Sequence, residues 1–568
     1  MNNKKELSYK DLKMVCNRDM FHFETTQDLE SVNDGIGQER GIKALQFGLQ
    51  VDVKGYNIYI EGPSGVGKTM YTKNYLDSIA PKKKVPNDWC YIYNFQNPNE
   101  PIAVSLPAGQ GKEFKESMDG FIQEVKKDIK KTFNADDFEK EKALIKQEYE
   151  EKREKLMEKL ANDALQYSFQ VKSAQNGIYM MPILDGKALK EEEFDKLDDE
   201  IKGQFEEKST VVQEMIMDVI GRIKQIERVS DKKIDEWQSN VALLTVNVHI
   251  NMLKAKYKRN KKINQFLTNV KKDVLKNVPV FLAEDTNDAK NQTPQQGPQL
   301  GQVQDPCLNY RVNLFVDNSE LEGAPVIMDS NYSYQNMFGK LEYENYYGAL
   351  KTDFTMLQAG LLHKANGGYI IFQAKDLLAN PACYEALKKA LRVKELGIEA
   401  ASEQRSSMVM ISLRPEPIPL DLKVILIGNS QIYQTLLAMD ADFKKLFKIK
   451  VEFEDDAPLN AENANKLARI IHGFCEHDNL PHLDKGAMCK LIEYASKLAG
   501  SHSKVSTRFD DLIQIAGEAA TWAKLSRSKV VTSQFMDKAL KEQINRVKKY
   551  DTKYMEMIKN HSLLIDTE

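Results

Sequence analysis

The sequence predicts an α/β protein, with a parallel-sheet core that is split by a long helical coiled-coil insertion and followed by an all-helical C-terminal region. Short apolar runs alternate with glycine and proline in residues 31–111 and again in 308–456, a pattern typical of buried parallel strands joined by helices. Between them, in 112–282, glycine and proline nearly vanish and lysine and glutamate dominate. Residues 457–550 look wholly helical, with 1–30 and 551–568 as flanking segments.

Composition excludes several classes of protein. The 568 residues suffice for about three or four domains, and 42% hydrophobic residues are too many for a disordered chain. With 80 basic and 83 acidic side chains, the net charge of −3 gives no overall reason for membrane or nucleic-acid binding. The start of the chain lacks the apolar core of a signal peptide, and the six cysteines form no CxxC pair. We therefore expect a reduced, cytoplasmic protein without a membrane span.

One group of side chains near the C-terminus has residue types that bind metals. His472, Cys475, His477 and His482 fall close together, and the first two would share a face of a helix, as metal ligands can. No second half-site with ligand spacing occurs in the sequence. We therefore interpret the group as a helix end with unrelated polar residues and predict no metal site there.

The helical insertion predicts an antiparallel coiled-coil arm. Apolar residues at 138, 145, 149, 156 and 160 draw a narrow seam on a charged helix, and Val211, Met215 and Val219 begin a second helical seam. The run Ile178–Met181 between them resembles a small hairpin, which either marks a contact site or packs against a neighbour. The polar, Gln/Pro-rich segment 283–307 predicts a flexible linker.

A glycine-rich loop between a predicted strand and a predicted helix is the strongest motif. Its residues are Gly62, Pro63, Ser64, Gly65, Val66, Gly67, Lys68 and Thr69, which match GxxxxGK[ST] in full. Glycines let backbone N–H groups curl around phosphates, and the helix that follows adds its positive N-terminal end. Lys68 would neutralise phosphate charge, and the Thr69 hydroxyl would bind Mg²⁺. The motif therefore predicts nucleotide binding.

A nucleotide-hydrolysing enzyme of this class also needs an acidic pair at the end of a neighbouring strand. The best candidate strand, 367–372, is followed by Gln373 and Ala374 instead. Three other carboxylates lie in the core without the standard position: Asp329, Asp353 and Asp376. For Asp376 we favour a cap on the helix that follows.

Two polar residues further along are candidates for sensing the bound nucleotide. Asn429 follows the buried run LKVILIG, where its side chain would reach a γ-phosphate or the attacking water; the alternative is an ordinary loop asparagine. Arg508 precedes an amphipathic helix of the C-terminal region, from which it would contact phosphate. The alternative is a surface ion pair with Asp510 or Asp511.

Together these residues resemble the ATPase part of the Lon-like ATP-dependent proteases, relatives of peptidase family S16 within the AAA+ superfamily. The similarity rests on IGQERGIKALQFGL, GPSGVGKT, VNLFVDNSELEGAPVIMD, GALKTDFTMLQAGLLHKANGGYIIFQAKDLL, LRPEPIPLDLKVILIGN and STRFDDLIQIAGEA. The resemblance implies an AAA+ P-loop core that binds ATP and Mg²⁺, with Asn429 as sensor one and Arg508 as sensor two. It also implies a lid at 457–550 and a substrate-handling insertion at 112–282. The partners that it implies are protein substrates and a homo-oligomeric ring.

The chain departs from the family pattern in two places. In the family a protease domain with a Ser–Lys dyad follows the lid, whereas this sequence ends at Glu568, so we expect no peptide cleavage by this chain alone and a protease domain in trans as a partner. Gln373 and Ala374 replace the usual acidic pair, which puts hydrolysis in question. For the family's arginine finger, the sequence offers only lysines: Lys444, Lys445, Lys448 and Lys450.

Three functional hypotheses remain after this comparison. The first is an ATP-hydrolysing module that unfolds or translocates proteins, and the second is an ATP-gated binding scaffold with little or no hydrolysis. The third is nucleic-acid binding through the basic run Lys254–Lys262, for which a solvated helix face is the favoured interpretation.

Overall fold

The structure is a computed structural model that divides into two compact units. It describes residues 12–30, 36–133, 136–174, 177–184, 187–189, 194, 198–278, 281, 305, 307–346, 349–398 and 413–566. The first unit comprises Met1–Tyr91, Asn99–Lys112 and Asn313–Glu568, and the second comprises Ile92–Pro98 and Glu113–Val312. The predicted linker 283–307 lies almost entirely outside the described residues. No helix within the described ranges combines the length and apolar character needed to cross a membrane.

A parallel sheet lies at the centre of the first unit. Within the described residues it has five strands in the order β17-β1-β16-β13-β8. Their bounds are Ile449–Glu452 for β17, Ile58–Glu61 for β1, Lys423–Gly428 for β16, Tyr369–Gln373 for β13 and Val326–Met328 for β8. The three middle strands are buried along nearly their whole length, as the continuous apolar runs predicted.

Helices cover both faces of this sheet because alternate side chains of each strand point to opposite sides. Ile58 and Ile60 pack with α1 (Glu39–Gln50) and α2 (Lys68–Ile79), whereas Tyr59 packs with helices on the other face. Those helices are α9 (Tyr334–Phe338), α10 (Leu361–Lys364), α11 (Ala374–Leu378), α12 (Pro381–Val393), α13 (Ser430–Met439) and α14 (Phe443–Leu446). The core is therefore a three-layer α/β arrangement.

Several short strand groups accompany the central sheet. One is the sheet β3-β2-β7, with β2 at Asp88–Ile92, β3 at Ile102–Leu106 and β7 at Val312–Val316. The antiparallel pairs are β9 (Lys340–Leu341) with β12 (Leu357–Gln358), β10 (Glu344–Tyr346) with β11 (Ala349–Lys351), and β14 (Glu395–Leu396) with β15 (Ile418–Pro419).

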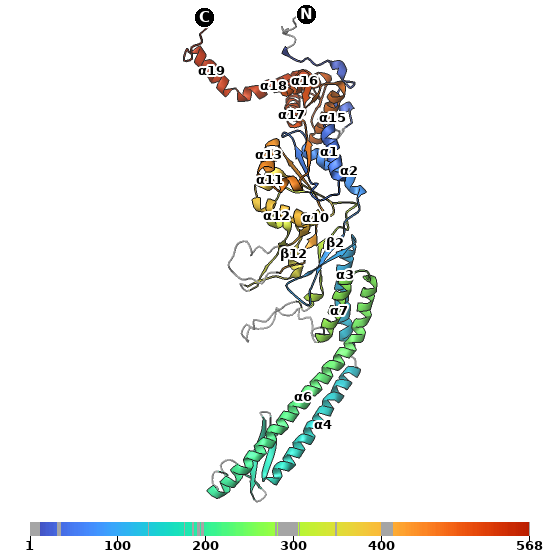
Figure 1. Cartoon of the computed structure of the whole chain (residues 1–568), viewed down its shortest axis with the longest axis vertical. Coiled ribbons are helices and arrows are strands. Elements are labelled where there is room, and N and C mark those ends of the chain that lie inside the picture. Colours follow the sequence, from blue (N-terminus) through green and yellow to red (C-terminus); the bar gives the residue numbers. More distant parts are fainter. Residues whose placement is uncertain are drawn as a thin grey trace. The chain divides into compact units, whose positions relative to one another are not determined.

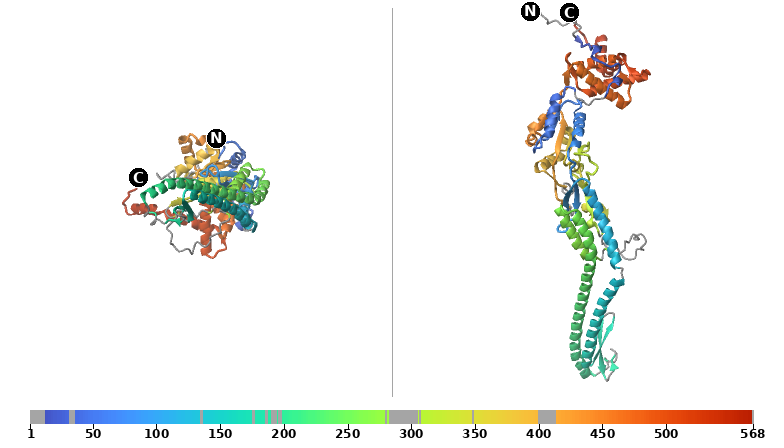
Figure 2. Two further views of the ribbon diagram at one scale, coloured as in Figure 1. Left: turned by 90° about the horizontal axis from the view of Figure 1, so that it is seen from below. Right: turned by 90° about the vertical axis from the view of Figure 1, so that its right-hand side faces the viewer.

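The C-terminal region, which we call the lid, is built from helices as the sequence predicted. They are α15 (Ala461–Asp478), α16 (Lys485–Ala499), α17 (Phe509–Leu525), α18 (Ser533–Val547) and α19 (Lys549–Lys559). Two short strand pairs join them, β18 (Asp456–Pro458) with β20 (Lys504–Ser506) and β19 (His482–Leu483) with β21 (Val530–Val531). The N-terminal segment lies against these helices (Figure 2), and Cys16, Phe21 and Phe23 are buried in the lid's apolar core.

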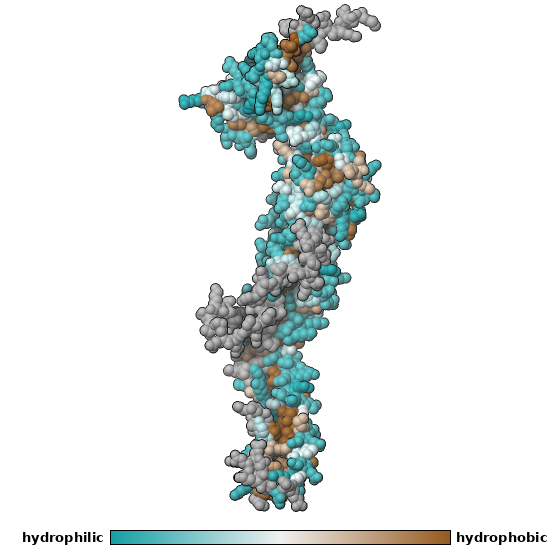
Figure 3. All heavy atoms as spheres, turned by 90° about the vertical axis from the view of Figure 1, so that its left-hand side faces the viewer, coloured by the Kyte–Doolittle hydropathy of each residue, from teal (hydrophilic) through white to brown (hydrophobic). Residues whose placement is uncertain are grey.

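The second unit contains the predicted antiparallel arm (Figure 1). Its helices are α3 (Gln110–Phe133), α4 (Asp136–Gln166), α6 (Asp199–Lys256) and α7 (Lys261–Lys276), with α4 beside α6. The seam contains the predicted Leu160, and on α6 the predicted Met215 and Val219 pack against it beside the buried Val212 and Ile216, while the predicted Val211 is exposed. Apolar side chains also remain on the arm's surface, where Figure 3 shows patches of them among hydrophilic ones.

The predicted hairpin at the end of the arm is a three-stranded antiparallel sheet. Its strands are β4 (Phe169–Ala174), β5 (Gly177–Leu184) and β6 (Lys187–Ala188), in the order β4-β5-β6. The apolar run Ile178–Met181 lies within β5, so its side chains alternate between two faces. Ile178 and Met180 pack against the arm's apolar core, whereas Tyr179 is half exposed. The sheet therefore buries one half of the run and presents the other.

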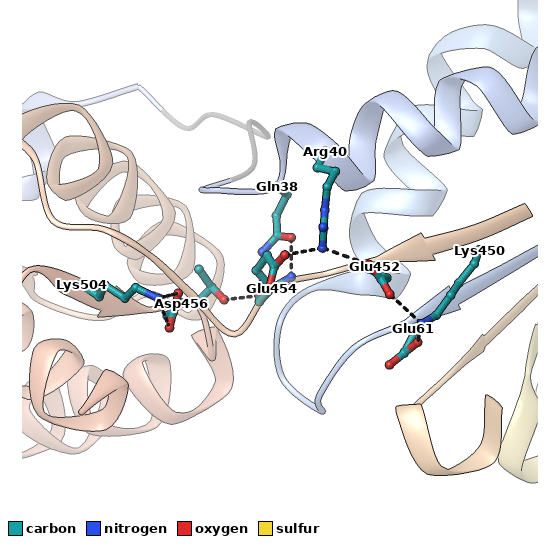
Figure 4. A network of polar contacts seen from close by, with 9 residues as sticks. Gln38, Arg40, Glu61, Lys450, Glu452, Glu454, Asp456 and Lys504 are labelled. Atoms are coloured by element: carbon teal, nitrogen blue, oxygen red, sulfur yellow. Dashed lines mark hydrogen bonds and ion pairs between the residues drawn. The ribbon is translucent and has the colours of Figure 1, made fainter. Parts of the chain in front are cut away.

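A network of polar contacts fixes the segment that connects the sheet to the lid (Figure 4). The side-chain amide of Gln38 donates to the Glu454 carbonyl at 2.9 Å and accepts from the Glu454 amide at 2.9 Å. Arg40 pairs with Glu452 and Glu454, and Thr507 of the lid donates to the same Glu454 carbonyl. Gln38 is 1% exposed, so its amide has no water to replace these partners.

The Gln38→Ala variant is expected to unfold at lower temperature than the wild type. The substitution removes two hydrogen bonds to the Glu454 backbone, each of which contributes about 0.5–1.5 kcal/mol to stability. Gln50→Ala, an exposed glutamine on the same helix α1, is the matched control. Thermal unfolding of both variants checks this, and equal melting temperatures would show that the Gln38 contacts add no stability.

Candidate nucleotide-binding site

The glycine-rich loop joins β1 to α2 at the carboxyl end of the sheet. Gly65 and Gly67 have φ angles of 85° and 75°, a region that side-chain-bearing residues rarely adopt. Val66 between them is fully buried in the apolar core, which anchors the loop from below. Gly67 directly precedes α2, so the first turn of that helix presents free backbone N–H groups beside the loop. This is the geometry of a phosphate cradle.

Lys68 turns its ammonium group back over the loop. Its Nζ donates to the Gly62 carbonyl at 2.8 Å and also to the Pro63 carbonyl. Burial lowers the pKa of Lys68 from its usual value, and the nearby carboxylate of Asp510 opposes that shift. The loop therefore holds a half-buried cation where the motif predicted one.

The lid reaches the loop through the first residues of α17. A β-carbon added to Gly65 would lie 3.1 Å from Asp510 Oδ2, and one added to Gly67 would lie 3.6 Å from the Phe509 ring. The Asp510 amide also donates to the Gly65 carbonyl at 3.4 Å. The loop and the lid thus share one surface, and the sequence analysis missed both lid residues because they lie over 400 positions from the loop.

Gln373 occupies the place where an acidic residue was sought. It ends β13, and its side-chain Nε2 donates to Thr69 Oγ1 at 3.0 Å. Ala374, which follows, is 1% exposed, so it faces the core rather than the loop. Residue 373 therefore lies beside Thr69, where an acidic residue was expected, and its side chain is an amide instead of a carboxylate.

The three other carboxylates have structural roles. Asp376 is exposed and lies in the first turn of α11, where its negative charge is favourable to the helix dipole. The predicted capping role was wrong, because the N-cap position belongs to Gln373. Asp329 accepts from the Asn331 amide in a turn after β8, and Asp353 caps a short 3₁₀ helix by accepting from the Thr355 amide.

Glu61, which the sequence analysis did not consider, stands directly before the loop at the end of β1. Lys450 lies 2.5 Å from its Oε2 and 2.6 Å from Glu452, so the candidate finger Lys450 is tied into this strand pair. Lys445 pairs with Asp442, and Lys448 lies over the Tyr56 ring. Lys444 is exposed on α14.

Asn429 follows β16, beside the strand that leads into the loop. Its side chain accepts from the Ile432 amide at 2.9 Å and so caps α13, while its carbonyl accepts from the Tyr59 hydroxyl at 3.0 Å. The residue has the predicted position, and one of its side-chain atoms is used in capping.

Arg508 precedes α17 and makes a weak ion pair with Asp455 at 3.9 Å. The predicted alternative, an ion pair with Asp510 or Asp511, was wrong about the partner, because the guanidinium lies beside Asp455 instead. Asp455 belongs to the segment that connects the sheet to the lid, so the Arg508 guanidinium lies beside this connecting segment.

The basic run Lys254–Lys262 spans the end of α6 and the start of α7. Lys254 donates to Thr268, and Lys256 pairs with Glu113 at 2.9 Å. Part of its charge is therefore used within the arm, which favours the solvated-face interpretation.

The Asp510→Asn variant is expected to bind ATP about fivefold more tightly than the wild type, because a unit charge about 4 Å from a phosphate costs about 1 kcal/mol in water. Asp511→Asn is the matched control, since both aspartates lie in the first turn of α17 and only Asp510 approaches the loop. Calorimetric titration of ATP into each variant is the measurement. Equal affinities in the two variants would remove Asp510 from the site.

Comparison with known families identifies three matching segments. Residues 322–454 match the LonB-like AAA domain, and residues 482–546 match the AAA+ ATPase lid domain of archaeal LonB. Residues 88–121 match the Lon-like LonC helical domain. The first two segments fall in the sheet and the lid described above.

Individual proteins that are similar to this chain are also Lon proteases or their homologs. Archaeal Lon protease of Thermoplasma volcanium is 27% identical over 41% of this chain and 36% of its own length. Archaeal Lon protease of Archaeoglobus fulgidus is 28% identical over 44% of this chain and 40% of its own length. The putative Lon protease homolog of Escherichia coli is 31% identical over 28% of this chain and 27% of its own length.

The chain thus spans about a quarter to two fifths of the length of these relatives. The matched segments contain Gln373, Asn429 and the lid residues that approach the loop. In its α/β core and helical lid, the chain is therefore similar to Lon-like AAA+ proteins.

Proposed function

We propose that this protein binds ATP with Mg²⁺ at residues Gly62–Thr69 and uses the nucleotide to move its lid. Lys68 would neutralise the β- and γ-phosphates, Asn429 would sense the γ-phosphate, and Arg508 would contact phosphate when the lid closes. The similarity of the core and the lid to Lon-like AAA+ proteins supports nucleotide binding and ATPase activity.

One observation carries the proposal, which is the contact of the lid with the phosphate loop. Because Phe509 and Asp510 approach Gly67 and Gly65, phosphates bound in the cradle would alter the surface on which α17 rests. Lid closure of this kind is a common way to convert nucleotide binding into domain movement. The movement would serve to unfold or translocate protein substrates, with the arm handling them, in a homo-oligomeric ring and with a protease domain acting in trans.

The donor set beside the loop fits a hard cation such as Mg²⁺. Thr69 supplies a hydroxyl oxygen, and the Gln373 side chain, 3.0 Å from it, also carries an amide oxygen. Mg²⁺ prefers oxygen ligands and keeps several waters, with phosphates completing its shell. The ion would neutralise charge that develops on the phosphates, while Thr69 orients it and Gln373 orients Thr69.

A second candidate function is an ATP-gated binding scaffold with little or no hydrolysis. It is favoured by Gln373 and Ala374, because neither can polarise an attacking water as a carboxylate does. Both candidates share the binding site and differ in turnover.

Phosphate release, measured with and without an unfolded protein, separates the two candidates. For the hydrolysing module we expect turnover above that of Lys68→Ala, and a gain for Gln373→Asp, which restores one carboxylate beside Thr69. For the scaffold, the wild type and Lys68→Ala release phosphate equally slowly, but only the wild type binds ATP. If Lys68→Ala binds ATP as tightly as the wild type does, the loop is not the site and both candidates fail.

A further inference from the structure

A group of three side chains in the lid lies away from the nucleotide site and has the composition of a metal site. His472 and Glu476 lie one turn apart on α15, and His482 lies on β19. One potential ligand atom from each falls within 4.8 Å of the others. The sequence analysis predicted no metal here because it sought a second half-site at ligand spacing. The fold brings Glu476 to the two histidines, whereas the Cys475 thiol contacts the Pro481 carbonyl.

A tight turn at the end of α15 brings the groups together. Asn479 adopts a φ of 52° and ends the helix, and the Leu480 amide then donates to the Cys475 carbonyl at 2.9 Å. The chain therefore folds back at once, and the His482 ring lies against the His472 ring with centroids 5.4 Å apart.

The hydrogen bonds of His482 leave one nitrogen directed at Glu476. Its Nδ1 lies 3.1 Å from the Thr26 hydroxyl, and its Nε2 lies 3.0 Å from Glu476 Oε1. Thr26 belongs to the N-terminal segment and is fully buried, so it fixes the orientation of the ring. Metal-binding histidines use one nitrogen for the ion and the other for such a supporting contact.

His472 provides the second observation. Its Nδ1 is buried and has no hydrogen-bond partner among the described residues. A buried nitrogen without a partner costs about 1–3 kcal/mol, and coordination of a cation by this atom would remove that cost. Glu476 is mostly exposed, which leaves a path for an ion to enter and a side from which water can complete the shell.

We propose that His472, Glu476 and His482 form a Zn²⁺ site that ties α15 to β19 and, through Thr26, to the N-terminal segment. Two histidines and one glutamate are a known zinc ligand set, with water as the fourth ligand. Ligand atoms about 2.0–2.2 Å from zinc lie about 3.3–3.6 Å from each other in a tetrahedron, and His482 Nε2 lies 3.0 Å from Glu476 Oε1.

The test uses the full, untagged chain after chelator treatment and a zinc titration in competition with a chromophoric chelator. We expect one equivalent of zinc to bind, and Glu476→Gln to weaken that binding by more than about 100-fold, since loss of even a supporting group costs roughly 10–100-fold. Glu476→Gln keeps the shape and the hydrogen bond of an exposed side chain, so the variant should fold. His477→Gln, which removes an exposed histidine outside the group, is the matched control.

Two further measurements complete the experiment. Zinc is expected to raise the melting temperature of the wild type and of His477→Gln, but not of Glu476→Gln. Cobalt in place of zinc should give the visible absorption of a tetrahedral site, and His472→Gln and His482→Gln should abolish it. If the wild type binds zinc no more tightly than Glu476→Gln does, the contact between His482 and Glu476 is a hydrogen bond alone and the proposal is wrong.

Discussion

The parallel pairing of β1 with its two neighbours is the constraint on which the site depends. Glu61, the last residue of β1, lies opposite Gly428 of β16 and Glu452 of β17. Since all three strands end at the same edge, the residues that follow them must meet there. This register places Asn429 on one side of the phosphate loop and the connection to the lid on the other. A slip of one residue would reverse the faces of β1 and move both.

Hydrogen bonds from two sides fix the backbone of Glu454 in the segment that connects the sheet to the lid. Gln38 uses both atoms of its amide on the backbone of Glu454, and the same carbonyl also accepts from Thr507. The residue that caps α1, before the phosphate loop, and a lid residue after it therefore hold the backbone of one residue, Glu454, between them. Movement of the lid must pivot about this residue or break its hydrogen bonds. The Arg508–Asp455 pair is long and half exposed, so it can exchange partners at little cost.

Sequence reasoning found the features that local chemistry dictates. The positive φ angles of the phosphate loop require glycine at positions 65 and 67, so the motif can be recognised in the sequence. The central strands can be recognised as apolar runs because both of their faces are buried. It missed contacts that join distant residues, such as Gln373 with Thr69 and Asp510 with Gly65. It also placed one seam residue at the exposed Val211 instead of its buried neighbour Val212, because an apolar stripe on a helix is wide enough for either residue to continue it. No local sequence pattern predicted that the N-terminal segment packs against the lid.

The charges around the loop suggest how nucleotide and lid are coupled. Glu61 is already paired with Lys450, and no carboxylate stands at Gln373 or Ala374, whereas the carboxylate of Asp510 from the lid raises the pKa of Lys68 against the effect of burial. A phosphate bound in the cradle carries more negative charge than one carboxylate, so it would pair with the Lys68 ammonium group in place of Asp510. Asp510 would then face a negative group across Gly65, and that repulsion would act on α17 directly. In the proposed function, the lid would then sense the phosphate through loss of an attraction, whether or not the phosphate is later cleaved.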